Sequence, residues 1–211
     1  MTLLPTLMTG IATIFVESSS GENMIVIVPG ANTKVTEDDV IKAEDDIAKS
    51  KAVVATLELG MSAVREAMKL GRKHGIKTIL NAAPARADYG KDILENVDIL
   101  VVNETEAELL SGDADPDKAG EVLKNICKNV IITLGKDGAL LWEEGKGRAK
   151  IDIVKMKQEE VVDTTGAGDA FVGSLAYFLA SRSDLSLTEA VQRSCHVASI
   201  TVKRSGTQVR N

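Results

Sequence analysis

The sequence predicts an α/β protein with a three-layer αβα core, a mostly parallel sheet and a β-hairpin outside that core. From residue 36 onwards, short apolar runs alternate with stretches of helical period, and the connections between them are short. Parallel strands need helical crossovers of this kind. Two further pairs of apolar runs are each separated by a polar loop that contains glycine, which is the pattern of a hairpin.

The first of these hairpins lies near the N-terminus. Residues 11–16 and 24–28 are apolar runs, and the polar segment 17–23 between them contains three serines, Gly21 and Asn23. We assign residues 1–30 to this hairpin and residues 31–211 to the core.

The core elements follow in alternating order. Thr36 is a favoured N-cap residue and predicts a helix that runs to about Lys49. The other expected elements are strands at 52–56, 77–81, 99–102 and 130–133, helices at 61–74, near Ile93, at 104–110, 116–127, 168–181 and 187–203, and a second hairpin of residues 139–142 and 149–154.

Composition excludes several classes of partner. The chain has 211 residues, enough for one domain with a full core. A net charge of −6 and an aromatic content of 3% disfavour nucleic acid, which needs cations and stacking surfaces. Cys127 and Cys195 form no C-x-x-C pattern, and no apolar stretch reaches the length of a membrane span. We therefore expect a cytoplasmic protein with no membrane partner.

The segment Asp163-Thr-Thr-Gly-Ala-Gly-Asp169 runs directly into an apolar helical pattern. A glycine-rich turn that opens a helix can bind phosphate through converging N–H groups and the helix dipole. Asp169 would then accept a proton from an attacking hydroxyl, as phosphoryl transfer requires. The alternative is that Asp169 merely complements the dipole. A P-loop is absent, and Phe171 stands where the dinucleotide fingerprint needs its third glycine.

Segment 163–169 resembles the C-terminal signature of the ribokinase family, the phosphofructokinase-B-type carbohydrate kinases. Residues 103–108, Asn-Glu-Thr-Glu-Ala-Glu, are similar to the family's N-x-x-E segment, which serves Mg²⁺ and phosphate. Further similar segments follow in the family's order, at 29–32, 57–58, 81–85, 133–135 and 206–208. The resemblance implies a ribokinase-like fold in which the first hairpin is the remaining half of a lid over a nucleotide-binding core.

The resemblance also implies roles for individual residues. Asp169 would deprotonate the primary hydroxyl of the sugar, Glu58 would contact the sugar, and Gly166, Ala167 and Gly168 would form an anion hole. The residues implied to bind the nucleotide are Asn103, Thr133, Gly135, Gly168 and Cys195, although the family often has Asn at the position of Cys195.

Two metal ions are implied as well. Glu106 would serve Mg²⁺ through water and phosphate, and K⁺ would be held by oxygens of Asp163, Thr165, Thr201, Arg204 and Gly206, the last three through backbone carbonyls. For Asn103 and Glu106, a helix N-cap with a capping box fits the spacing equally well. Thr133 and Gly135 could likewise be a strand end and a turn that need no ligand.

The resemblance begins in the middle of the family's sequence. The upstream segment that supplies most sugar contacts and the other half of the lid has no counterpart here, and the unpaired lid strands would favour a homodimer. We expect ATP-dependent phosphorylation of D-ribose at O5, reduced by the missing segment. The alternatives are another sugar or a nucleoside as substrate, or an inert nucleotide-binding module that pairs with a full-length partner.

Overall fold

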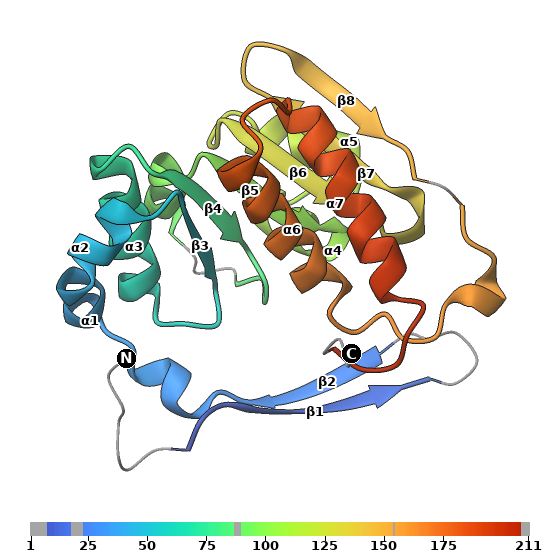
Figure 1. Cartoon of the computed structure of the whole chain (residues 1–211), viewed down its shortest axis with the longest axis horizontal. Coiled ribbons are helices and arrows are strands. Elements are labelled where there is room, and N and C mark those ends of the chain that lie inside the picture. Colours follow the sequence, from blue (N-terminus) through green and yellow to red (C-terminus); the bar gives the residue numbers. More distant parts are fainter. Residues whose placement is uncertain (1–7, 18–22, 87–89, 154, 208–211) are drawn as a thin grey trace.

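The computed structural model describes residues 8–17, 23–86, 90–153 and 155–207 (Figure 1). These residues form a two-stranded sheet and a six-stranded sheet. The two-stranded sheet lies apart from the layers of the core, below them in the view of Figure 1. No helix within the described residues has the length and apolarity that a membrane span requires.

The two-stranded sheet is the predicted first hairpin. Strands β1 (Ile11–Val16) and β2 (Asn23–Val28) pair antiparallel, with Ile11 opposite Val28 and Val16 opposite Asn23. Every residue of both strands is exposed, although most are apolar. The hairpin therefore presents apolar side chains to the solvent.

The six-stranded sheet has the order β3-β4-β5-β6-β7-β8. Strands β3 (Ala52–Thr56), β4 (Lys77–Asn81), β5 (Ile99–Asn103) and β6 (Asn129–Thr133) are parallel neighbours. Strands β7 (Ala139–Glu143) and β8 (Gly147–Ile151) add an antiparallel hairpin at one edge. The expectation of a mostly parallel sheet is confirmed.

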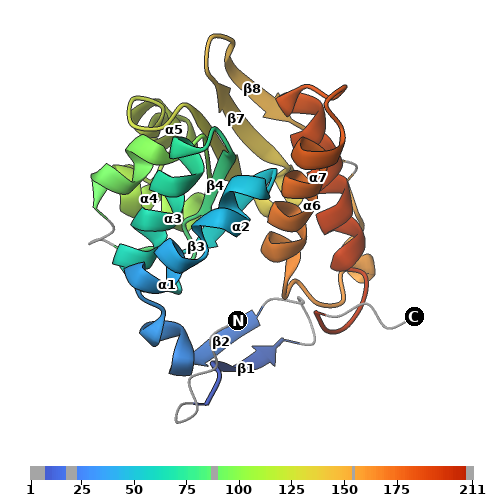
Figure 2. The ribbon, with the colours of Figure 1, turned by 60° about the vertical axis from the view of Figure 1, so that its left-hand side comes forward.

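Helices cover both faces of this sheet, which confirms three layers (Figure 2). On one face lie α3 (Met61–Lys73), α4 (Glu104–Ser111) and α5 (Pro116–Leu123), and α6 (Ala167–Ser181) and α7 (Leu187–Thr201) lie on the other. Successive residues of β5 alternate between the two cores: Leu100 and Val102 pack toward α3–α5, whereas Ile99 and Val101 pack toward α6 and α7. Both faces are buried, so the strand is continuously apolar.

The structure corrects the prediction of one helix over residues 36–49. It contains two helices, α1 (Glu37–Lys42) and α2 (Glu44–Lys49), which meet at Ala43. Thr36 caps α1 as expected. The acidic residues 44–46 form the first turn of α2, where negative charge complements the helix dipole.

Shorter elements differ from expectation mainly at their ends. The predicted helix near Ile93 is the 3₁₀ helix η2 (Lys91–Asn96), and further 3₁₀ turns are η1 (Gly30–Lys34), η3 (Gly135–Asp137) and η4 (Gln158–Glu160). Helix α5 ends at Leu123 rather than at residue 127, and α7 ends at Thr201 rather than at residue 203. Strand β8 runs from Gly147 to Ile151 rather than over residues 149–154, and Val154 itself lies outside the described residues.

Candidate active site

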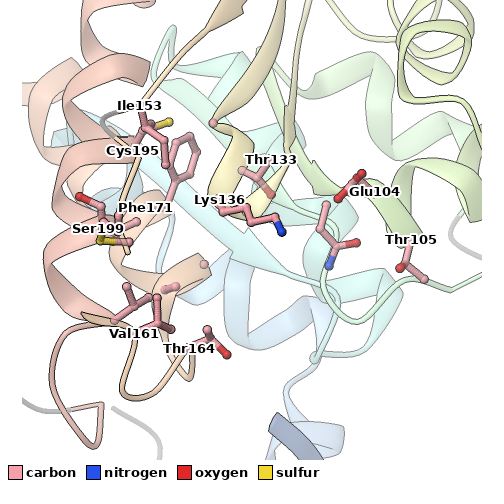
Figure 3. Close-up of a pocket in the computed structure, with 18 residues that line it drawn as sticks. Glu104, Thr105, Thr133, Lys136, Ile153, Val161, Thr164, Phe171, Cys195 and Ser199 are labelled. Atoms are coloured by element: carbon pink, nitrogen blue, oxygen red, sulfur yellow. The ribbon is translucent and has the colours of Figure 1, made fainter. Parts of the chain in front are cut away.

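A cavity of about 640 Å³ opens at the carboxyl ends of β5 and β6, between the first turns of α4 and α6 (Figure 3). In open α/β sheets, this edge is where ligands bind. Six of the residues that the sequence singled out line the cavity: Asn103, Thr133, Gly135, Ala167, Gly168 and Cys195. The structure therefore brings together segments that are far apart in the chain.

The N-terminus of α6 forms one wall of this cavity. Its N-cap is Gly166, in the left-handed region at φ 77°, and no side chain caps the helix. First-turn N–H groups of a helix have no partner within the helix, although that of Ala167 donates to the Thr164 carbonyl at 3.2 Å. A Cβ atom on Gly168 would meet no other atom within 4 Å. The backbone is thus open to an anion, as an anion hole requires.

Asp169 is the third residue of α6, directly after two residues that line the cavity. Its side chain is exposed and has no ion pair among the described residues. Asp169 itself is not part of the cavity lining, and its role as a base stays a prediction.

Glu58 lies farther from the cavity than expected. It is exposed in the turn after β3 and does not line the cavity. Because β3, β5 and β6 are parallel, Glu58 nevertheless lies at the same edge of the sheet as Asn103 and Thr133. Its proposed contact with a sugar stays a prediction.

Asn103 and Glu106 form the capping box that was one of their two interpretations. Asn103 Oδ1 accepts from the Glu106 N–H at 2.8 Å, and Glu106 Oε2 accepts from the Asn103 N–H at 2.9 Å. Burial raises the pKa of Glu106, and the hydrogen bond from the Asn103 backbone partly opposes this shift. Asn103 lines the cavity whereas Glu106 does not. The capping role is confirmed, and a role toward Mg²⁺ stays a prediction.

Asp163 joins the loop before α6 to the loop after α7. Its Oδ1 accepts from the Thr165 N–H at 2.9 Å and its Oδ2 accepts from the Gly206 N–H at 3.0 Å. The Thr165 side chain and the Gly206 N–H hold the pKa of Asp163 below its usual range. The N–H groups of Val162 and Asp163 also donate to the carbonyl of Val202.

The residues expected to hold K⁺ therefore lie on two segments that touch each other. Asp163 and Thr165 precede α6, and Thr201, Arg204 and Gly206 stand at the end of α7 and in the loop after it. Thr165 Oγ1 is buried. It is close enough to the Asp163 carboxylate to lower the pKa of that group, but its distances and angles do not make a regular hydrogen bond with any described group. A buried oxygen without a hydrogen-bond partner fits a place where a cation or water is bound.

The two ends of the cavity differ in chemistry. Glu104 and Thr105 lie on one wall, whereas Phe171, Cys195 and Ile153 gather on the opposite side (Figure 3). Burial raises the pKa of the Cys195 thiol to about 11, so this group is a neutral, weakly polar part of the apolar end. An apolar end suits a flat heteroaromatic ring, whereas the uncapped N-terminus of α6 is the part of the cavity wall that suits phosphate.

Sequence reasoning missed two features of this site. Lys136 lines the cavity, although its position after Gly135 in a turn indicates only that it is exposed. Asn23 Nδ2, at the start of β2, donates to Thr164 Oγ1 at 3.2 Å, which links the hairpin to the loop before α6. The two residues are 141 positions apart, and no local pattern could pair them.

The comparisons with known proteins agree with this geometry. A ribokinase of Mus musculus is 40% identical over 206 residues, covering 95% of this chain and 63% of the relative. The solved ribokinase structure from Giardia lamblia superposes with a TM-score of 0.84 at 29% identity, covering 96% of this chain and 69% of that one. An Arabidopsis thaliana ribokinase solved with ribose and ATP superposes with a TM-score of 0.80 at 27% identity, covering 95% of this chain and 65% of that one.

The chain spans about 63% of the length of the mouse ribokinase and of a Staphylococcus aureus ribokinase that is 38% identical to it. The family model for pfkB family carbohydrate kinases matches residues 4–211, which is nearly the whole sequence. With the fold and the glycine-rich start of α6, this match shows that the chain belongs to the pfkB family of carbohydrate kinases.

Proposed function

We propose that this chain carries the nucleotide-binding and phosphoryl-transfer site of an ATP-dependent kinase that phosphorylates D-ribose at O5. The observation that carries the proposal is the uncapped, glycine-opened N-terminus of α6, which borders a cavity of nucleotide size and bears Asp169 in its first turn. The ribokinases of mouse and S. aureus support ribose as substrate, and the Arabidopsis structure supports ribose and ATP as a pair.

The proposed reaction follows from the two ends of the cavity. The nucleobase occupies the apolar end near Cys195, and the phosphate chain runs to the first turn of α6. Asp169 accepts the proton of the sugar hydroxyl while the oxygen of that hydroxyl forms a bond to the γ-phosphorus. The bond from that phosphorus to the bridging oxygen breaks, ADP leaves, and N–H groups of α6 stabilise the charge on the transferred group.

Mg²⁺ and K⁺ belong to this proposal. Mg²⁺ binds with few protein carboxylates and several waters, and the described residues hold no cluster of three or more His, Cys, Asp or Glu side chains that would bind a metal alone. Glu106 and Asn103 would hold Mg²⁺ through water and phosphate, and the ion would neutralise charge on the phosphates. The Asp163 carboxylate and the buried Thr165 hydroxyl fit a K⁺ site that would support the anion hole.

We further propose that Glu58 contacts the sugar, that the hairpin of β1 and β2 closes over it as a lid, and that two chains associate through these strands. The division into a lid, residues 1–30, and a nucleotide-binding core, residues 31–211, belongs to the same proposal. A cytoplasmic location agrees with the use of ATP and with the two free cysteines.

The test is the substitution Asp169→Asn. Loss of the general base should lower kcat by about a thousandfold, while the dissociation constant for ATP, measured by calorimetry, changes less than twofold. Asp45→Asn is the matched control, because Asp45 also lies in the first turn of a helix but far from the cavity in sequence and fold. It should leave kcat unchanged.

Retained turnover in Asp169→Asn, or equal losses of turnover and ATP binding, would contradict the role of Asp169 as base. Binding of ATP by the unaltered chain without any ribose-dependent ATP consumption would instead favour a nucleotide-binding module.

A further inference from the structure

Lys136 is the one Lys, Arg or His side chain among the described residues that line the active-site cavity. It belongs to η3, in the turn between β6 and β7. Figure 3 shows its ammonium group directed into the cavity, toward the wall that carries Glu104. Within the described part of the chain, Lys136 forms no ion pair.

The backbone of this turn is held in place. The N–H of Leu134 donates to the carbonyl of Gly138 at 2.8 Å, and the N–H of Asp137 donates to the carbonyl of Leu134 at 3.0 Å. A Cβ atom on Gly138 would lie 2.0 Å from the carbonyl oxygen of Ile151, so only glycine allows the turn to pack this closely on the end of β8. The turn therefore presents the Lys136 side chain from a fixed position.

The cavity needs positive charge if it binds a nucleotide triphosphate. The chain carries a net charge of −6, and Glu104 lines the same cavity. The N-terminus of α6 contributes roughly half a positive charge, which is small against a polyphosphate. An ammonium group without a carboxylate partner can bind a phosphate without first breaking an ion pair.

We propose that Lys136 binds the phosphate chain of the nucleotide, from a wall of the cavity other than the start of α6. The inference rests on the proposed function, since it takes ATP as the ligand of the cavity. The ammonium group acts as a point charge, so its contribution falls with the number of phosphates on the ligand and with rising salt.

The experiment compares the unaltered chain with Lys136→Met, and uses Lys128→Met as the matched control. Lys128 is an exposed lysine that does not line the cavity, so its loss changes the net charge equally. Calorimetry is carried out with ATP, ADP and adenosine. Lys136→Met should weaken ATP binding about tenfold, the scale of a charge-assisted contact at an exposed site, and should leave adenosine binding within twofold.

Two further results are expected. Lys136→Arg should keep most of the ATP affinity because it keeps the charge, and 0.5 M NaCl, at roughly a 4 Å Debye length, should narrow the difference between Lys136→Met and the unaltered chain. Lys128→Met should bind all three ligands as the unaltered chain does.

The proposal is overturned if Lys136→Met binds ATP as tightly as Lys128→Met does, or if it loses adenosine affinity as strongly as ATP affinity. The measured quantity is ATP binding, not turnover. If the chain binds ATP but phosphorylates no sugar, the proposed kinase function is contradicted, and the Lys136 comparison still tests whether this residue binds phosphate. A failure of the unaltered chain to bind ATP would overturn both proposals.

Discussion

Single residues near the cavity combine structural and chemical roles. Asn103 caps α4 and lines the cavity, and Asp163 connects two loops while belonging to the proposed K⁺ site. A capping residue at the carboxyl end of a parallel strand stands by geometry at the edge of the sheet where ligands bind. The two interpretations of Asn103 therefore do not compete.

Asp163 supports a prediction about stability and pH. Replacing it with Asn leaves one side-chain oxygen for two N–H donors, those of Thr165 and Gly206. One of these two donors then loses its partner, and the free energy of unfolding at pH 7 should fall by about 1–3 kcal/mol. Urea unfolding measures this change.

The lowered pKa of Asp163 sets the sign of the pH dependence. The carboxylate contributes its full stability above the unfolded-state pKa of about 3.9 and loses it as the pH falls through the lower folded-state value. The difference between Asp163→Asn and the unaltered chain should thus shrink from pH 7 to pH 3. Asp152→Asn, at an exposed carboxylate, is the control, and its free energy of unfolding should differ from that of the unaltered chain by no more than about 0.5 kcal/mol. An Asp163→Asn difference that is equal at both pH values would contradict this assignment.

At the scale of an element, the start of α6 is a helix terminus without a side-chain cap. Among the described helices, α1, α4, α5 and α7 have a side-chain cap, whereas α2, α3 and α6 have none; α6 begins at Gly166 in the left-handed region. A side-chain cap would accept hydrogen bonds from the same N–H groups that would otherwise bind an anion. The missing cap lowers helix stability and opens the site.

Two glycine substitutions in α6 should have opposite effects on stability. Gly166→Ala places an alanine at φ 77° with its Cβ 3.2 Å from Thr207 Cγ2, and should lower the free energy of unfolding by about 1–2 kcal/mol. Gly168→Ala replaces a helical glycine that has open space around it, and should raise the free energy of unfolding by up to about 1 kcal/mol.

The same Gly168→Ala methyl group should stand between the backbone and a phosphate, and we expect about tenfold weaker ATP binding because close backbone approach is lost. Thermal unfolding with and without ATP measures both effects, since a ligand that binds the folded state raises the unfolding midpoint, and a tighter ligand raises it more. Stronger or unchanged ATP stabilisation in Gly168→Ala would argue against the anion hole.

At the scale of the whole molecule, the hairpin and the core are built differently. The core buries apolar side chains on both faces of its sheet, whereas Phe15, Met24, Val26 and Val28 of the hairpin are each more than half exposed. Exposed apolar strands with free edges favour association with other strands. The hairpin is therefore the surface through which two chains are proposed to meet.

Lysine on this surface should oppose self-association. Val26→Lys places a charge on β2, and sedimentation velocity over a range of concentrations should show less association than for the unaltered chain. Val122→Lys makes the same change on exposed α5 and serves as control. Equal association of both variants would show that the hairpin is not the interface.

Much of this architecture follows from local patterns. The strands of the core were predicted within a few residues because each is a short apolar run bounded by polar turns, and the capping function of Thr36 follows from its residue type. The break at Ala43 was missed, since two short helices in series have nearly the same apolar period as one long helix. The glycine motif at 166–168 and Asp169 were identified because turn, helix start and carboxylate are contiguous in the chain.

By itself, the sequence determined the class of the fold, the order of its elements and the glycine-rich start of α6, since these depend on period, residue type and contiguity. Only the tertiary structure decided which groups meet. It brought Lys136 into the cavity, joined Asp163 to Gly206 across 43 residues, linked Asn23 to Thr164, and left Glu58 outside the cavity lining. These outcomes depend on how strands pair and loops pack, and contacts between distant segments leave no periodic signal in one sequence.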